Sequence, residues 1–491
     1  MTTTRVISSP RRAGAEPAAA PGLAGRIEAA TAPALVTLFL ATVILPIFLN
    51  VGGLTLTLSR ILLLVLCVPL FMRLVSGRAG RLLLADYFFM LYAFWILVSL
   101  TYHHGISRFA LSGITIVEHF GAYLLGRTLI RNVADYRHYM KVFFITMLIL
   151  FPAAVVELNT NINLWTKLLG TVFDVAHKGQ SAYGRMGLER VQSGFEHPIH
   201  FGMYCALGVA NFFYLYRNQL AKALPMMGFS TFMSFMSLSS GPLLAIALQV
   251  ILILWDQITR GKWKLFVILC AIGYVTIDTL SNRTPVTILI STLTFNSGSA
   301  WTRVGIWDYG IAAVWRSPIF GIGLNDWPRP FWLTSSVDNF WLLTMMRHGI
   351  VALVFLGCGI VLGLRDIVRT KGLDAEQTLI RTGYVISVAA LLFSLSTVHI
   401  WGAAGSYVMF YFGAGLWLCS AGTDKLPEGE AEAEAGPDVR RRAQATSRLQ
   451  PESPAAAGRP PAQPVAAERG GGRGLPQSRF AHVHRREDPK G

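Results

Sequence analysis

Apolar residues gather along this chain in long blocks, and polar, often basic, connections separate the blocks. Several blocks reach the roughly 20 residues that a helix needs to cross a hydrocarbon core of ~30 Å. The pattern therefore predicts an all-α fold, a polytopic transmembrane bundle of about 12 helices. The predicted spans are 33–50, 56–75, 83–101, 109–130, 142–158, 199–216, 226–236, 242–255, 265–280, 339–364, 379–396 and 402–419.

These spans divide the chain into three parts. We expect a disordered cytoplasmic N-terminus at 1–30, a transmembrane domain at 31–420 and a disordered cytoplasmic tail at 421–491. The tail is rich in Ala, Pro, Gly, Glu and Arg, a composition that cannot bury a core. Two connections inside the transmembrane domain, at about 159–198 and 281–338, are much longer than the rest, and loops of this kind tend to carry function.

Basic residues predict the orientation of the bundle. Every second short connection is rich in Arg and Lys, as at 73–81, 127–141 and 260–264. Such residues favour the cytoplasmic side, so an even number of spans places both termini in the cytoplasm. The two long loops then lie on the opposite, periplasmic face.

The composition supports lipid as the main solvent of the chain. Charged residues make up only 14% of it, whereas soluble domains carry about 25%. In such a protein a net charge of +16 indicates loop orientation, and we expect no nucleic-acid partner. The five cysteines all lie in apolar blocks without a C-x-x-C pair, which favours buried thiols over disulfides or a metal site.

Arginine in the two long loops runs against the orientation bias. The first loop contains Arg185 and Arg190, and the second contains Arg283 and Arg303 with two further arginines and no lysine. Guanidinium groups make bidentate contacts with phosphate that lysine cannot match, so they favour an anionic substrate. Ordinary pairing with Asp and Glu of the loops is the alternative. The chain has no D-x-D pair of the kind that holds a metal-bound sugar nucleotide.

Other polar residues each allow a functional and a structural interpretation. His197 and His200 share a helix face if a helix begins near Pro198, where they position a substrate or form a capping and packing cluster. Asp86 and the pair Glu118-His119 lie within predicted spans. Ionisable groups there are candidates for function, although pairing inside the bundle is the interpretation that we favour.

Three stretches of the chain contain motifs that occur in a fixed order. The first, at 190–202, contains a G-F-x-H-P pattern before a helix, and the second, at 237–242, is a turn of small residues. The third, at 303–350, contains S-P-I-F-G-I-G, then D-N-F-W-L and then H-G-I. Together these stretches resemble the O-antigen ligase and polysaccharide polymerase family of bacterial membranes. The resemblance covers roughly residues 30–420, and the order and spacing of the motifs are its most specific part.

This resemblance implies a metal-independent enzyme of the glycosyltransferase type, without a cofactor, in the bacterial inner membrane. It implies transfer of a glycan from an undecaprenyl-diphosphate carrier to an acceptor hydroxyl. Carried over by position, Arg190 and Arg303 are the first candidates for the diphosphate, and Arg185 and Arg283 follow them.

One position departs from the pattern of the family. Ligases commonly have a histidine before the asparagine of the late loop, whereas this chain has Asp338 before Asn339. A carboxylate can accept the proton of a sugar hydroxyl, with His197 as the other candidate base. The departure favours a chain-extending polymerase of exopolysaccharide or O-antigen repeat units.

The catalytic candidates are Asp338, Arg303, Arg190 and His197, and the substrate-binding candidates are Arg185, Arg283, Glu196, His200, Asn339 and Trp307. The expected partners are an undecaprenyl-diphosphate-linked oligosaccharide, membrane lipid, and a chain-length regulator and export proteins that the sequence does not identify. The alternatives are an O-antigen ligase that acts on a lipid acceptor and a polysaccharide flippase or transporter.

Overall fold

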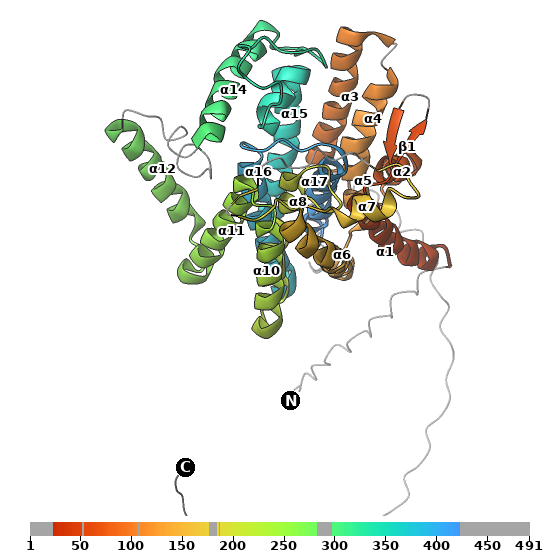
Figure 1. Cartoon of the computed structure of the whole chain (residues 1–491). Coiled ribbons are helices and arrows are strands. Elements are labelled where there is room, and N and C mark those ends of the chain that lie inside the picture. The colour runs from red at the N-terminus through yellow and green to blue at the C-terminus, as the bar shows by residue number, and fades with distance from the viewer. Residues whose placement is uncertain are drawn as a thin grey trace, which may run out of the picture. The chain divides into compact units, whose positions relative to one another are not determined.

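The computed structural model describes residues 23–51, 54–106, 109–175, 184–185, 187–281 and 297–422. These residues form a helical bundle with a small β-hairpin, as the hydropathy pattern predicts (Figure 1). Most of the predicted N-terminal segment 1–30 and nearly all of the predicted tail 421–491 lie outside the described residues.

The first half of the bundle is built from long helices and one hairpin. Its elements are α1 (Leu23–Ile44), β1 (Phe48–Val51), β2 (Leu54–Thr57), α2 (Leu58–Val75), α3 (Leu84–His104), α4 (Phe109–Ile116), the π-helix η2 (Val117–Gly121), α5 (Ala122–Leu129), α6 (Val133–Thr160) and α7 (Leu164–Leu169). The predicted first span reaches residue 50, but α1 ends at Ile44. Pro46 follows, and a proline disfavours helical backbone before it. The chain then enters β1, which pairs antiparallel with β2.

The second half contains the other helices that the described residues form. They are α8 (Pro198–Ala206), α9 (Gly208–Leu215), α10 (Leu220–Phe235), α11 (Ser240–Thr259), α12 (Trp263–Leu280), α14 (Ser297–Arg316), α15 (Phe340–Arg369), α16 (Ala375–Ser394), α17 (Gly402–Ala414) and the 3-10 turn η3 (Leu416–Cys419). The sequence predicts a loop over 281–338, and α14 lies within it. Because α14 contains charged and small residues, its mean hydropathy is too low for a membrane span, and hydropathy alone does not predict this helix.

Eight helices within the described residues are long and apolar enough to cross a membrane. They coincide with eight of the predicted spans, with α4, η2 and α5 together forming the span at 109–129. The other four predicted spans are shorter helical segments in the structure: 31–44, the α8–α9 pair, α10 and α17. The architecture is that of an all-α, multi-pass membrane protein.

Close helix packing at α17 depends on glycine. A Cβ atom on Gly126 of α5 would lie 2.1 Å from the carbonyl oxygen of Phe410 of α17, and one on Gly413 would lie 2.3 Å from that of Tyr123. Small residues at such a crossing let two backbones approach, which is a common way to associate helices in lipid. The crossing sets α17 in the interior, where nearly all of its residues are buried.

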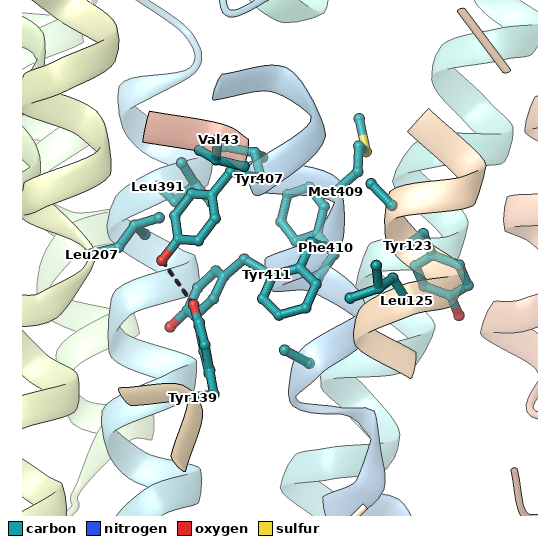
Figure 2. Packing of buried hydrophobic residues seen from close by; sticks show 14 of the residues in the cluster. Val43, Tyr123, Leu125, Tyr139, Leu207, Leu391, Tyr407, Met409, Phe410 and Tyr411 are labelled. Carbon is teal, nitrogen blue, oxygen red and sulfur yellow. Dashed lines mark hydrogen bonds between the residues drawn. The ribbon is translucent and has the colours of Figure 1, made fainter. Parts of the chain in front are cut away.

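The core around α17 is rich in tyrosine. Figure 2 shows Tyr139 of α6 and Tyr407 of α17, whose hydroxyl groups form a hydrogen bond of 2.8 Å. Nearby, the Tyr136 hydroxyl donates to Asn211 Oδ1 at 2.7 Å, and Asn211 Nδ2 donates to the Tyr411 hydroxyl at 2.7 Å. These bonds satisfy hydroxyl groups that burial would otherwise leave without a partner, and they tie α6, α9 and α17 together.

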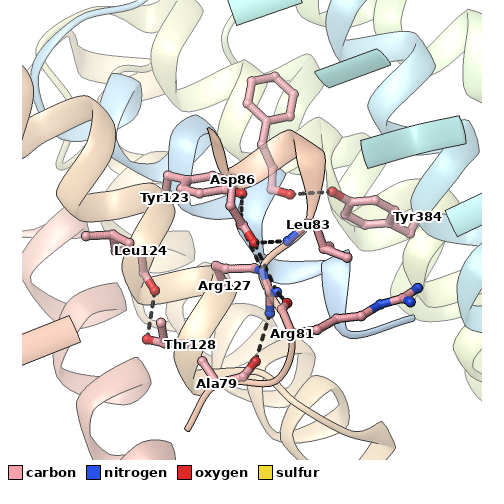
Figure 3. Close-up of polar contacts among 10 residues, drawn as sticks. Ala79, Arg81, Leu83, Asp86, Tyr123, Leu124, Arg127, Thr128 and Tyr384 are labelled. Atoms are coloured by element: carbon pink, nitrogen blue, oxygen red, sulfur yellow. Dashed lines mark hydrogen bonds and ion pairs between the residues drawn. The ribbon is translucent and has the colours of Figure 1, made fainter. Parts of the chain in front are cut away.

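A buried ion pair holds α3 to α5. Asp86 accepts a hydrogen bond from the Tyr123 hydroxyl at 2.5 Å and from Arg127 Nε at 3.1 Å, and its second oxygen accepts from the Leu83 amide at 2.8 Å (Figure 3). Arg127 also donates to the carbonyl oxygens of Ala79 and Arg81. Because both charged groups are fully engaged with protein, the structure supports the structural interpretation of Asp86.

Helix α15 is broken at Gly349, where φ is 80°. The break frees carbonyl groups that the segment 317–323 then satisfies: the amide of Ile322 donates to Met346 O at 2.7 Å, and that of Gly323 donates to Arg347 O at 2.9 Å. In return the Ile350 amide donates to Pro318 O at 2.8 Å. The S-P-I-F-G-I-G and H-G-I motifs therefore form one folded unit.

Candidate functional site

The segment before α8 carries Arg185 and Arg190, and hydrogen bonds to neighbouring helices hold it in place. Glu157, near the end of α6, accepts hydrogen bonds from the amides of Gln192 and Ser193 at 3.2 and 2.9 Å. The amide of Val191 donates to Met236 O at 3.0 Å. These contacts fix the segment around residue 190 between the ends of α6 and α10.

Arg185 and Arg190 both bind the turn of small residues between α10 and α11. Arg190 Nη2 donates to Ser239 Oγ at 2.7 Å, and Arg185 Nη1 donates to the carbonyl oxygen of Leu238 at 2.8 Å. Leu238 has a φ of 45°, which a non-glycine residue rarely adopts, and it is the carbonyl oxygen of this residue that Arg185 binds. Two of the three motifs that suggested the family resemblance are thus in direct contact.

The third motif adds Arg303 of α14 and Asp338, just before α15. Arg303 and Asp338 are partly buried, and Arg303 Nε has no hydrogen-bond partner among the described residues. Burial raises the pKa of Asp338, while the positive charges of Arg303 and Arg190 oppose that rise. Burial and then the charges of Arg185 and Arg303 lower the pKa of Arg190 to about 10, so its guanidinium remains charged at neutral pH.

The electrostatic balance of this cluster is positive. The charge of Arg303 helps to lower the pKa values of both Arg185 and Arg190, and the carboxylate of Asp338 opposes the lowering of the pKa of Arg303 by burial. Three positive charges therefore face one negative charge in a partly desolvated place. We call these four residues the arginine cluster. Such an arrangement can bind an anionic group through charge-assisted hydrogen bonds.

His197 and His200 lie beside this cluster. His197 is the N-cap of α8, where its Nδ1 accepts from the Ile199 amide at 3.1 Å, and α8 begins at Pro198 as expected. Burial and the nearby charges of Arg190 and Arg185 lower the pKa of His197 to about 4, so its ring is neutral at neutral pH. His200 is buried, and its ring packs edge-on against Trp401 at 4.0 Å between centroids. Both contacts fit the capping and packing interpretation.

The other predicted site residues have different surroundings. Asn339 is the N-cap of α15, where its Oδ1 accepts from the Leu342 amide at 3.0 Å. Glu196 lies against Gly402, since a Cβ atom there would meet Glu196 Oε1 at 2.5 Å. Trp307 lies on α14 one turn beyond Arg303 and is 45% exposed. Arg283 lies outside the described residues.

A second polar site was not predicted as such from the sequence. It is a pocket of about 220 Å³ between α2, α3, α4, η2, α15 and the connection from α16 to α17. Its charged and histidine lining consists of Arg60, Glu118, His119, Arg347, His348 and His399. We call it the Arg347 pocket.

Most polar groups of the Arg347 pocket are paired with protein. Arg60 Nε donates to Glu118 at 2.6 Å, and the Tyr92 hydroxyl lies 3.1 Å from His119 Nδ1. Glu118 and His119 therefore have the pairs inside the bundle that we favoured from the sequence. A signal for the pocket was available, because Arg60 and Arg347 both lie within predicted spans, where charged residues are rare.

Comparison with known proteins identifies a family that part of the chain resembles. Residues 225–357 match the family model described as O-antigen ligase. The matched segment contains the 237–239 turn, Arg303, Asp338 and Arg347, whereas Arg190 precedes it. No curated protein matches the chain. The match confirms the predicted resemblance to the O-antigen ligase and polymerase-like family, and it supports a function in glycan transfer at a membrane.

Proposed function

We propose that this O-antigen ligase-like membrane protein polymerises exopolysaccharide or O-antigen repeat units at the periplasmic face of the bacterial inner membrane. The donor is an undecaprenyl-diphosphate-linked glycan, the acceptor is a sugar hydroxyl, no metal takes part, and both termini are cytoplasmic. The observation that carries the proposal is the arginine cluster. Its excess positive charge suits a diphosphate, and the carboxylate of Asp338 is near enough to Arg303 and Arg190 to feel the charge of both.

The proposed reaction is a displacement at the anomeric carbon of the donor. The acceptor hydroxyl oxygen bonds to that carbon, the bond from the carbon to the diphosphate oxygen breaks, and Asp338 takes the proton of the hydroxyl. The leaving undecaprenyl diphosphate keeps the electron pair. Arg190 and Arg303 stabilise the negative charge that grows on it, with Arg185 as a further contact.

Arg303 offers the sharpest test because its Nε makes no hydrogen bond within the described residues, so its replacement breaks no protein hydrogen bond of that atom. The purified protein is incubated with a synthetic undecaprenyl-diphosphate-linked repeat unit, and products are resolved as a ladder on a gel. We expect Arg303→Ala to abolish the ladder and Arg303→Lys to retain a small part of it. Arg316→Ala, an exposed arginine on the same helix, is the matched control. A normal ladder from Arg303→Ala would remove this residue from the mechanism.

An O-antigen ligase is the second candidate, and the description of the matched family model favours it. A ligase would transfer the finished glycan to a lipid acceptor instead of a second repeat unit. The lipid-linked products of a deletion strain separate the classes. Loss of a polymerase leaves single repeat units on the carrier at the outer face, and loss of a ligase leaves long chains on the carrier. A flippase mutant would instead hold single units at the inner face.

A further inference from the structure

We propose that the Arg347 pocket binds a sugar residue of the acceptor glycan that carries a single carboxylate, such as a uronic acid. The role of this glycan as the acceptor rests on the proposed glycan transfer, whereas its binding in the pocket does not. The pocket is separate from the arginine cluster, and none of its lining residues has a role in the reaction described above.

The charges of the pocket favour a ligand with one negative charge. Arg60 is neutralised by Glu118 at 2.6 Å and also donates to Thr55 O at 2.6 Å. The guanidinium of Arg347 has no hydrogen bond or ion pair within the described residues, so it is the single uncompensated cation when histidine is counted as neutral. A diphosphate carries more charge than one guanidinium can offset, and the arginine cluster, with its larger excess, suits it better.

The remaining lining favours a carbohydrate. Tyr92, Phe340 and Trp401 contribute aromatic surface on which the face of a sugar ring can pack. His399 Nδ1 is buried without a hydrogen-bond partner among the described residues, and burial with the charges of Arg347 and His119 lowers the pKa of His399 to about 3. A neutral imidazole offers one donor and one acceptor, which a sugar hydroxyl can satisfy.

The pocket also has the right neighbours for an acceptor. Phe340, which lines it, follows Asp338 by two residues and is held in place by hydrogen bonds from its amide to Leu395 O and Val398 O. Trp401, at the same edge, contacts the rings of His200 and His197. A glycan with one residue in the pocket would thus run along the segment that carries the proposed base.

Binding to the full-length protein in phosphatidylcholine nanodiscs tests this without turnover. The probes are a disaccharide that ends in methyl glucuronide and the same disaccharide ending in methyl glucoside. We expect the glucuronide to bind about tenfold more tightly, as one charge-assisted hydrogen bond would give. Arg347→Gln should remove this preference, Arg347→Lys should keep part of it, and Arg316→Gln should leave it intact.

Three results would overturn the inference. They are equal binding of the two probes, a preference that survives Arg347→Gln, and displacement of the glucuronide by geranyl diphosphate in a manner that depends on Arg347. The last would assign the pocket to a lipid diphosphate. A monodisperse elution profile establishes that each variant is folded. If glucuronide binding depends on Arg347 but no ladder forms from any lipid-linked repeat, the proposed transfer fails and the site stands.

Discussion

The guanidinium of Arg190 donates a hydrogen bond of 2.7 Å to the hydroxyl group of Ser239, which in turn donates to Ser237 O at 2.9 Å. The first of these bonds joins the loop before α8 to the turn before α11, where Arg190 Nε also donates to Ser237 O at 3.4 Å. It orients a charged side chain through a residue that would not contact a diphosphate itself.

Replacing Ser239 with alanine should misorient Arg190 and slow transfer. A hydrogen bond to a charged group contributes about 1.5–3 kcal/mol, so we expect a loss of roughly tenfold in kcat/KM for the lipid-linked donor. The measurement is the initial rate of ladder formation, and the thermal midpoint should barely change. Ser336→Ala, at an exposed position of the long loop, should have no effect. An unchanged rate in Ser239→Ala would show that Arg190 needs no such support.

The ionisation of Asp338 should set the acid limb of the pH profile of kcat/KM. Burial raises its pKa, so the carboxylate is lost at a higher pH than the usual value of about 3.9. Activity is then present above the raised pKa and falls as the pH drops through it. We expect kcat/KM to decline on acidification with a single ionisation, and Asp338→Asn to be inactive.

His197 provides the comparison for this profile. Its low pKa, about 4, and its role as an N-cap indicate that Asn, also a good cap, can replace it. We expect His197→Asn to keep the activity and the same acid limb. A limb that disappears in this variant would make His197 the base.

Removal of Arg127 should destabilise the bundle. Asp86 would remain as a buried, uncompensated carboxylate, and breaking a buried pair in this way costs about 3–5 kcal/mol. Thermal unfolding of Arg127→Met in detergent should show a strongly lowered midpoint. The exposed pair of Arg137 and Glu376 is the control, since Glu376→Gln should cost at most about 1 kcal/mol. A similar midpoint for the two variants would contradict this account.

The glycine crossing between α5 and α17 should tolerate no larger residue. In Gly126→Ala the new Cβ atom would lie 2.1 Å from Phe410 O, so the helices must separate and the buried core around α17 would open. We expect little folded protein after size-exclusion chromatography. Gly113→Ala, where a Cβ atom meets nothing within 4 Å, should be neutral or slightly stabilising. Folded protein at normal yield from Gly126→Ala would argue against the tight crossing.

The fold could be predicted from hydropathy because lipid demands long apolar helices with internally satisfied backbones. The hydropathy pattern was least informative where tertiary contacts decide whether a segment forms a helix and where that helix lies. Helix α14 has too few apolar residues to resemble a span, and α17 is only 13 residues long but lies in the core. Pro46, visible in the sequence, could have indicated the end of α1.

The candidate site was predictable only in part. The motifs indicated Arg190, Arg303 and Asp338, but their meeting depends on contacts between residues far apart in sequence, which no local pattern encodes. The same limit applies to the Arg347 pocket. Arg60 and Glu118 lie on different helices, and His399 lies in a short connection that carried no motif.

The break in α15 at Gly349 has a consequence for chimeric proteins. Segment 317–323 supplies backbone partners to residues on both sides of the break, and a Cβ atom on Gly349 would lie 1.8 Å from Ile319 O. Grafts between homologues that take one piece without the other would mismatch two interlocked backbones. Exchange of substrate specificity between such proteins should therefore succeed only when both pieces are transplanted from the same parent.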